Sequence, residues 1–237
     1  MPLLSFIQEI GSSLKHLLIP PACACCNTPL LYEEEPICLH CQLSLQPTNF
    51  HLHGDNPLAR QFWGLDSITS AAACYYFLKG SKVQGLMHQI KYQRNKAAAL
   101  FIGELYGKAL AVSSFSRCDY LVPVPLHSSR LRQRGYNQSE VFAKGLSTGM
   151  HIPVVADVLV RVKKGGSQTF RSRQERFAML EGAFELAGST AYLEGRHILL
   201  VDDVITSGAT LEICARLFLG LGCQVSIIAI AYTQSEL

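Results

Sequence analysis

Apolar residues recur along the chain with two different spacings, and the change between them divides the sequence. Between residues 3 and 19 they stand three and four positions apart, which predicts an amphipathic helix that ends at Pro20 and Pro21. From residue 69 onward, apolar runs alternate with amphipathic segments. This rhythm predicts strands separated by helices, and therefore an α/β domain whose mostly parallel sheet is covered by helices on both faces.

The boundaries of the expected elements follow from the same pattern. The expected strands are 70–78, 119–126, 154–160, 197–202 and 224–232. The expected helices are 81–92, 96–112, 138–149 and 209–219, the third with Asn137 as its N-cap. Residues 162–182 lack periodicity and are expected to form a long loop. The chain thus divides into a helix (1–21), a cysteine-rich segment (22–47), a connector (48–68) and the α/β domain (69–237).

Composition narrows the class of protein. Of the 237 residues, 49% are hydrophobic and 16% are charged, which excludes a mainly disordered chain. The first residues lack the basic segment of a signal peptide, and no apolar run approaches the ~18 residues of a membrane span. We therefore expect a cytoplasmic protein. The amphipathic helix is expected to dock on its own protein, with a membrane surface or a partner as alternatives, so a position at the inner face of the membrane stays open.

The nine cysteines indicate a metal site. Five of them lie between residues 23 and 41, and this odd, clustered set is not a disulfide framework. Two Cys-x-x-Cys pairs, Cys23 with Cys26 and Cys38 with Cys41, offer four thiolates at the spacing that tetrahedral Zn²⁺ requires. The sequence therefore predicts a structural zinc ribbon over 22–47. Cys25 and His40 are alternative ligands. The remaining four cysteines are expected to be buried thiols: Cys74, Cys118, Cys214 and Cys223.

A second candidate site follows the strand expected at 197–202. This strand leads into Asp202 and Asp203, and a loop with three hydroxyl side chains and one glycine (206–210) precedes the next helix. Loop N–H groups at a helix N-terminus favour a phosphate, and carboxylates accept hydrogen bonds from vicinal hydroxyls. The arrangement predicts a site for a ribose 5-phosphate. The alternative is that Thr206 or Ser207 only caps the helix while the aspartates face water.

Two motifs resemble known families. Residues 201–210 (VDDVITSGAT) resemble the diphosphate-sugar motif of the type I phosphoribosyltransferases. Residues 123–127 (PVPLH), followed by Arg130, Arg132 and 134–138 (RGYNQ), resemble the signature of the ComF/GntX-like family, in which a cysteine zinc ribbon precedes a phosphoribosyltransferase domain. The resemblance extends from Cys23 to about Tyr232.

Three smaller segments extend this resemblance or depart from it. Gln168, Arg176 and residues 182–184 match the family, but Ala178-Met179 stand where the family usually has an asparagine. Lys91 and Tyr92 lie in a stretch, HQIKYQ, that also resembles the family. A lysine at the C-terminal end of a helix is also favoured without any function.

The resemblance implies a type I phosphoribosyltransferase fold and a site for phosphoribosyl diphosphate (PRPP) with Mg²⁺. Asp202 and Asp203, the catalytic candidates, would hold the ribose hydroxyls. The implied PRPP-binding residues are Thr206, Ser207, Gly208, Ala209 and Thr210 at the 5-phosphate, and Leu126, His127, Arg130 and Arg134 near the diphosphate. Asn137 is expected to be a cap, and four aromatic residues are expected in the core: Phe62, Trp63, Tyr75 and Tyr76.

The charge distribution leaves two functions open. The whole chain carries +3, but residues 127–176 contain ten basic and three acidic residues, a local net charge of +7. A basic segment beside the candidate site suits PRPP and equally suits a nucleic-acid backbone. Family members are linked to natural competence, so the rivals are a phosphoribosyltransferase and a non-catalytic protein that binds single-stranded DNA or other competence proteins such as a helicase. The sequence does not identify an acceptor.

Overall fold

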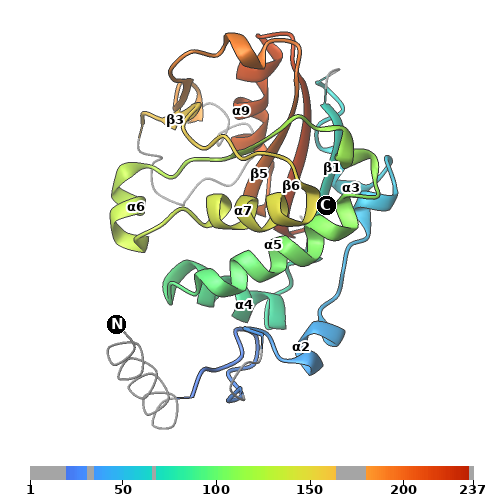
Figure 1. Cartoon of the computed structure of the whole chain (residues 1–237), viewed down its shortest axis with the longest axis vertical. Coiled ribbons are helices and arrows are strands. Elements are labelled where there is room, and N and C mark those ends of the chain that lie inside the picture. Colours follow the sequence, from blue (N-terminus) through green and yellow to red (C-terminus); the bar gives the residue numbers. More distant parts are fainter. Residues whose placement is uncertain (1–19, 31–34, 66–67, 164–179, 235–237) are drawn as a thin grey trace, which may run out of the picture.

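The computed structural model describes residues 20–30, 35–65, 68–163 and 180–234 (Figure 1). The expected helix over 3–19, most of the expected loop over 162–182, and the family residues Gln168 and Arg176 lie outside these ranges. Within them, no helix is long and apolar enough to cross a membrane. The helices are α2 (Leu39–Ser44), α3 (Pro57–Arg60), α4 (Lys82–Tyr92), α5 (Lys96–Leu110), α6 (Ser128–Arg134), α7 (Gln138–Met150) and α9 (Ala209–Leu219). The strands are β1 (Ile68–Tyr76), β2 (Tyr120–Pro123), β3 (Leu159–Arg161), β4 (Phe184–Leu186), β5 (His197–Ile205) and β6 (Gln224–Tyr232).

Four parallel strands form the central sheet in the order β1-β6-β5-β2, and β3 and β4 form a separate antiparallel pair. Strand β6 accompanies β5 to its end, where Ile205 lies opposite Tyr232. Strand β2 pairs with β5 only as far as Pro123 opposite Val201. The stretch 202–205 of β5 is therefore not paired with β2, and the candidate site lies at this step in the sheet.

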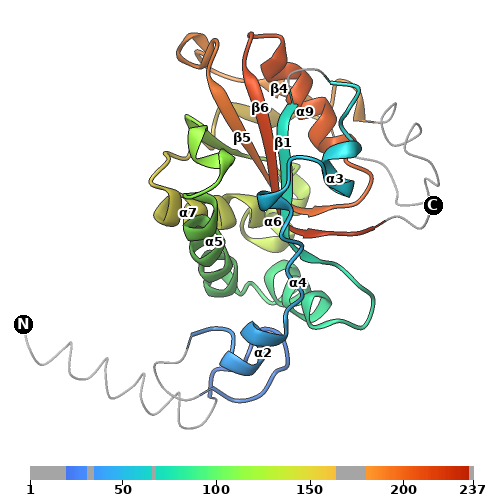
Figure 2. The ribbon, with the colours of Figure 1, turned by 90° about the vertical axis from the view of Figure 1, so that its right-hand side faces the viewer.

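Helices cover both faces of the sheet, as the alternating pattern predicts. Helix α7 packs on β5 and β2 with α5 beside it, while α9 packs on the other face of β5 and β6 (Figure 2). Helices α5 and α7 approach closely because each presents glycines to the other. A Cβ atom on Gly103 would lie 2.4 Å from the Phe142 carbonyl oxygen, and one on Gly145 would lie 2.2 Å from that of Leu100.

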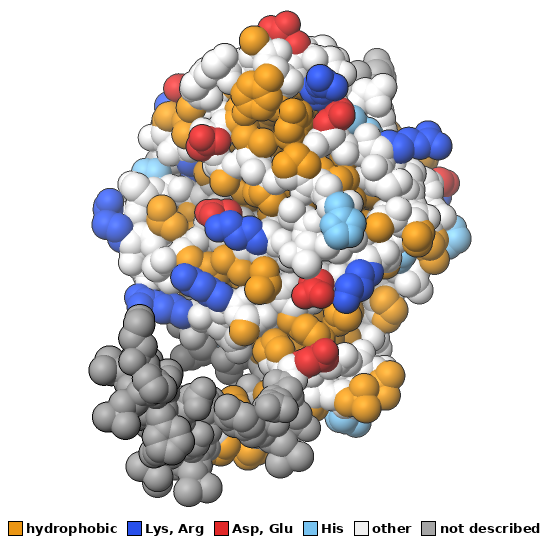
Figure 3. Space-filling model, in the orientation of Figure 1, with side chains coloured by type: hydrophobic (Ala, Val, Ile, Leu, Met, Phe, Trp, Pro, Cys, Tyr) orange, Lys and Arg blue, Asp and Glu red, His pale blue; other side chains and the backbone are white. Residues whose placement is uncertain are grey.

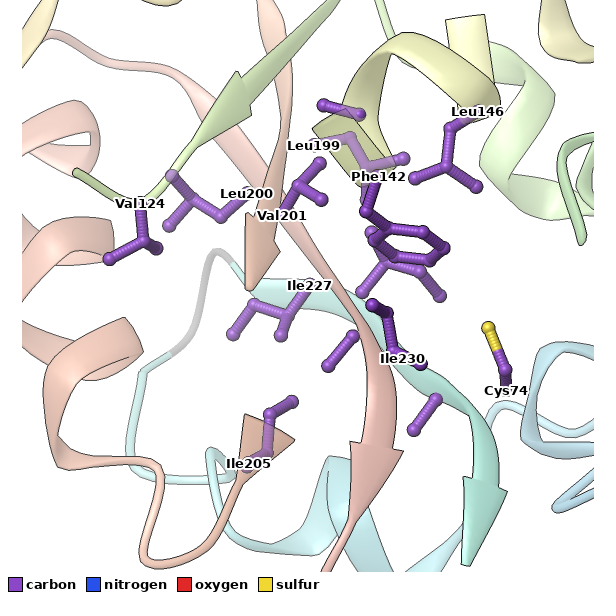
Figure 4. Close-up of a cluster of buried hydrophobic side chains, with 14 of the residues drawn as sticks. Cys74, Val124, Phe142, Leu146, Leu199, Leu200, Val201, Ile205, Ile227 and Ile230 are labelled. Carbon is purple, nitrogen blue, oxygen red and sulfur yellow. The ribbon is translucent and has the colours of Figure 1, made fainter. Parts of the chain in front are cut away.

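The apolar runs of β5 and β6 form the centre of the core. Leu199, Val201 and Ile227 are fully buried, and Phe142 of α7 lies over them (Figure 4). The thiols of Cys74, Cys118, Cys214 and Cys223 are all buried, as the sequence predicts.

The segment between the cysteines and the sheet covers the free edge of β1. The Thr48 backbone N–H donates to the Cys74 carbonyl at 3.0 Å, and Asn56 Nδ2 donates to the Ala71 carbonyl at 3.0 Å. Asn56 also caps α3. The expectation that Trp63 belongs to the core is wrong: its side chain is 67% exposed, while Phe62 is buried and Tyr75 and Tyr76 are half-buried.

Three expected elements need correction. The apolar run 154–160 contributes only β3, because the chain bends at 157–158 and Val154 makes an isolated bridge to Leu121. The strand expected at 119–126 ends at Pro123, and it is followed by α6, a helix that the hydrophobic pattern does not predict. Strand β5 continues to Ile205 rather than ending at residue 202, because its hydrogen bonds to β6 persist after β2 has ended.

Candidate functional site

The two aspartates lie in β5 just past the end of β2, and they face different neighbours because adjacent strand residues point to opposite sides. Asp202 Oδ1 accepts a hydrogen bond from Ser139 Oγ at 3.1 Å and from the Asp203 backbone N–H at 2.8 Å. Asp203 lies instead against cations, with Lys91 Nζ at 3.1 Å and Arg134 Nη1 at 3.7 Å. The first residues of α7 and the last turns of α4 and α6 therefore meet at these two carboxylates.

Asp202 has an unusual acidity for a carboxylic acid. Its burial, together with the negative charge of Asp203, raises the pKa of Asp202 to about 7. The hydrogen bonds from Ser139 and the Asp203 N–H, and the charge of Lys91, oppose this rise in pKa only in part. Asp202 therefore exchanges a proton close to neutral pH, which makes its hydrogen-bonding role dependent on pH.

Lys91 belongs to the candidate site. Its position near the C-terminal end of a helix would also be favourable for a lysine that has no functional role. Its side chain is only 20% exposed and Nζ points at Asp203. Arg134 is also covered, donates to Gln138 Oε1 at 2.8 Å, and lies with its guanidinium 5.7 Å from the centre of the Tyr92 ring. In the sequence, only the resemblance of the stretch HQIKYQ to the family indicates that Lys91 is a site residue.

Two further cations, Arg161 and Arg130, interact electrostatically, and Arg161 also interacts with Asp202. Arg161, at the end of β3, packs its guanidinium 5.0 Å from the centre of the Phe184 ring, and Nε donates to the Lys163 carbonyl at 3.3 Å. Burial and then the charge of Arg130 lower the pKa of Arg161. Within the described ranges neither arginine forms an ion pair with a carboxylate. Two neighbouring guanidinium groups create a local positive potential that favours an anion.

Arg161 lies in the basic stretch 127–176, but no motif in the sequence marks it as a site residue. The separation of Arg130 and Arg161 along the chain hides their proximity. Arg132, which lies between two selected arginines in the sequence, is exposed on α6.

Residues 206–208 connect β5 to α9, with Gly208 as the N-cap, and Ala209 and Thr210 begin the helix, so the segment 206–210 covers this connection and the first residues of α9. The alternative in which Thr206 or Ser207 is the N-cap therefore does not describe this helix. Gly208 has φ +74°, and a Cβ atom there would lie 2.9 Å from Phe62 Cζ. Both the backbone conformation and the contact with Phe62 require glycine. The loop thus brings its backbone and hydroxyl groups to the end of the strand that carries the aspartates.

The residues that follow β2 serve partly as helix caps. His127 is the N-cap of α6, and its Nδ1 accepts from the Ser129 backbone N–H at 3.2 Å. Asn137 caps α7 by accepting from the Ser139 N–H at 3.2 Å, as the sequence predicts, and Nδ2 donates to the Val124 carbonyl. Leu126 is half-buried in the same connection between β2 and α6.

The four cysteines of the two Cys-x-x-Cys pairs converge at a separate site. The Sγ atoms of Cys23, Cys26, Cys38 and Cys41 all lie within 4.8 Å of one another. A tetrahedral ion with Zn–S bonds of ~2.3 Å places its sulfur atoms roughly 3.8 Å apart, so the cluster fits one metal ion.

The surroundings of the cysteines indicate which of them bind a metal. Hydrogen bonding by Thr28 lowers the pKa of Cys26 to about 6, which favours the thiolate that a metal needs. Among the described residues, neither Cys25 nor His40 is part of the cluster. The alternative ligand sets that include either residue are therefore not supported.

Comparison with known proteins identifies relatives of the chain. Residues 137–236 match the family model of the phosphoribosyl transferase domain. The competence protein F of Haemophilus influenzae is 38% identical over 106 residues, 45% of this chain and 46% of that protein. The match thus spans about half the length of that relative.

Two further relatives extend the comparison. The DNA utilization protein YhgH of Escherichia coli is 28% identical over 222 residues, which are 87% of this chain and 94% of that protein. The competence protein ComFC of Bacillus subtilis is 34% identical over 115 residues, 48% of this chain and 44% of that protein.

Proposed function

The chain belongs to the ComF family and contains a phosphoribosyl transferase domain, and from this premise we propose that its site binds PRPP with Mg²⁺. The main support for this proposal is the position of Asp202 and Asp203. They lie at the step where β2 ends, directly before the loop 206–210 and the N-terminus of α9. This arrangement combines acceptors for a sugar diol with donors for a phosphate.

Each part of PRPP has candidate partners. Asp202 and Asp203 accept hydrogen bonds from the ribose hydroxyls, and the backbone and hydroxyl groups of 206–210 bind the 5-phosphate. Arg130 and Arg161, with the connection at 126–127, are the proposed partners of the diphosphate, because the charges of the two arginines act on each other and His127 begins α6. Bound Mg²⁺ would contribute positive charge at the diphosphate with few direct protein ligands.

The proposed chemistry is displacement at the anomeric carbon. The bond from this carbon to the diphosphate oxygen breaks with its electron pair, and the acceptor forms the new bond to the same carbon. The leaving diphosphate carries negative charge, which Arg130 and Arg161 stabilise in this proposal. The protein positions the reactants and needs no nucleophile of its own.

Calorimetric titration of the folded protein with Mg-PRPP tests the proposal. The double variant Asp202→Ala plus Asp203→Ala is expected to lose binding while its circular dichroism and unfolding transition remain. Asp55→Asn is a matched control, because this acid is exposed and forms an ion pair with Arg60 at the surface. Absence of binding to the folded wild-type protein would contradict the proposal.

A second function, binding of single-stranded DNA in competence, is favoured by Tyr92. Its side chain is 60% exposed beside the guanidinium of Arg134, and Lys and Arg side chains gather over α6 and the turn between α4 and α5 (Figure 3). An exposed aromatic ring within a basic surface is the combination on which bases stack.

Salt dependence tests this second function. The affinity for a single-stranded oligonucleotide is expected to fall steeply between low and physiological salt, and Tyr92→Ala is expected to weaken it about tenfold. Binding that is absent, or that does not respond to salt, would remove this candidate.

We also propose that the ion held by Cys23, Cys26, Cys38 and Cys41 is Zn²⁺ and that its role is structural. Four thiolates suit this ion, and such a set leaves no open coordination position for a substrate.

A further inference from the structure

Helix α4 connects the cysteine cluster to the site, and its packing on the cluster is tight. A Cβ atom on Gly85 would lie 2.7 Å from the Cys25 carbonyl oxygen, so only glycine permits the observed approach. Gln89 Nε2 donates to Asn27 Oδ1 at 3.0 Å, one residue after the first cysteine pair. In Figure 2, α4 lies between the cysteine segment with α2 and the sheet.

The other end of the same helix reaches the site. Lys91, in the last turn, lies 3.1 Å from Asp203, and the Tyr136 hydroxyl donates to the Ile90 carbonyl beside it. Helix α4 has only 11 residues, so a displacement at Gly85 moves Lys91. Its backbone hydrogen bonds prevent the two ends from responding independently.

We propose that the metal-bound cysteine segment positions Lys91 through α4, so that metal occupancy sets the affinity of the site for its phosphorylated ligand. Gly85 and Asn27 are the positioning residues, because they contact the segment and the helix but not the ligand. The ligand named in the tests, Mg-PRPP, rests on the function proposed above.

The physical reason lies in the small size of the segment. A metal module too short to bury its own core depends on the ion for its fold. Without the ion, the Cys25 carbonyl and Asn27 no longer hold α4, and Lys91 withdraws from Asp203. The repulsion between Asp202 and Asp203 is then less compensated, and one carboxylate takes up a proton more readily. A protonated carboxyl group is a poorer acceptor for ribose hydroxyls.

The first experiment compares metal-loaded and metal-depleted protein, freed of chelator, in Mg-PRPP titrations. Depletion is expected to weaken binding about tenfold in the wild-type protein, the effect of one charged hydrogen bond. In Lys91→Met, binding is expected to be weak already and depletion to cause no further loss. An equal loss in both proteins, or in neither, would overturn the proposal.

Gly85→Ala perturbs the contact while the metal stays bound. Because the added Cβ meets the Cys25 carbonyl, this variant is expected to keep its metal and bind Mg-PRPP more weakly by a similar factor. Gly64→Ala is the control, since a Cβ there meets nothing within 4 Å. A metal-loaded Gly85→Ala protein that binds like the wild type would argue against the helix as the connection.

A readout without PRPP separates this inference from the proposed function. Lys91 is 20% exposed and Lys108 is 64% exposed, so amine labelling followed by mass spectrometry is expected to modify Lys91 slowly and Lys108 rapidly. Metal depletion and Gly85→Ala are each expected to accelerate labelling of Lys91 and leave Lys108 unchanged. This result holds even if PRPP fails to bind, whereas unchanged labelling of Lys91 refutes the connection.

Discussion

Asp202 and Asp203 are adjacent in the sequence, yet their side chains meet different environments. Asp202 faces the hydroxyl of Ser139 at 3.1 Å, and Asp203 faces the ammonium group of Lys91 at 3.1 Å. A carboxylate that is buried without a contacting cation costs free energy, which a neighbouring cation or a ligand can offset. The burial of Asp202 therefore costs the domain stability, and this cost accompanies the proposed ability to bind a sugar.

Removal of the charge at Asp202 is expected to stabilise the domain. Because the pKa of Asp202 rises from 3.8 to about 7 on folding, its contribution to the unfolding free energy decreases as pH rises between those values. Asp202→Asn is expected to raise the unfolding free energy at pH 8 by about 1–2 kcal/mol and to have little effect near pH 4. Urea unfolding at both pH values measures this, and a destabilised variant at pH 8 would contradict it.

The same pKa predicts how binding depends on pH. Asp202 accepts hydrogen bonds best when ionised, and its pKa is about 7. Affinity for Mg-PRPP is therefore expected to fall about tenfold from pH 8 to pH 6. Calorimetric titrations across this range test it, and in Asp202→Asn the dependence should be largely lost. An equally steep dependence in the variant would assign the titration to another group.

At the scale of the elements, the close approach of α5 and α7 determines where the site residues stand. Ser139, which donates to Asp202, is in the first turn of α7. The position of α7 depends on four glycines at its contact with α5: Gly103 and Gly107 in α5, and Gly145 and Gly149 in α7. The sequence predicts both helices but not their separation, because a glycine within a helical pattern does not reveal what it contacts.

Gly145→Ala tests the importance of this approach. The added Cβ atom would lie 2.2 Å from the Leu100 carbonyl oxygen. The other nearest atoms also belong to the backbone of α5, so no flexible side chain can move aside. The variant is expected to lose about 2–3 kcal/mol of unfolding free energy. Gly54→Ala, with nothing within 4 Å, is the control in the same denaturation experiment. Equal stability of the two variants would show that the helices can separate without cost.

Helix α6 shows where element prediction failed. Its seven residues, SSRLRQR, have no buried side chain, so hydrophobic periodicity could not reveal it. The cap provided by His127 and the left-handed Gly135 at its C-terminal end define the helix instead. The helix matters for the site because it places Arg134 beside Asp203.

At the scale of the whole molecule, the cysteine segment and the domain share an interface through α4. Metal analysis is expected to find one zinc per chain, lost in Cys26→Ser and kept in Cys25→Ser. Depletion of the metal is expected to increase amide hydrogen exchange in 22–30 and 35–47 before the sheet is affected. Full protection of these residues in metal-free protein would refute a structural role for the ion.

The sequence by itself determined the features that depend on neighbours along the chain. The ranges 209–219 and 224–232 agree with α9 and β6 at both ends, and the grouping of the four cysteines is confirmed, because each follows from local spacing. Only the tertiary structure decided which distant residues meet. Lys91 at Asp203, and Arg130 beside Arg161, depend on how helices cross the sheet, and no spacing along a single chain encodes that geometry.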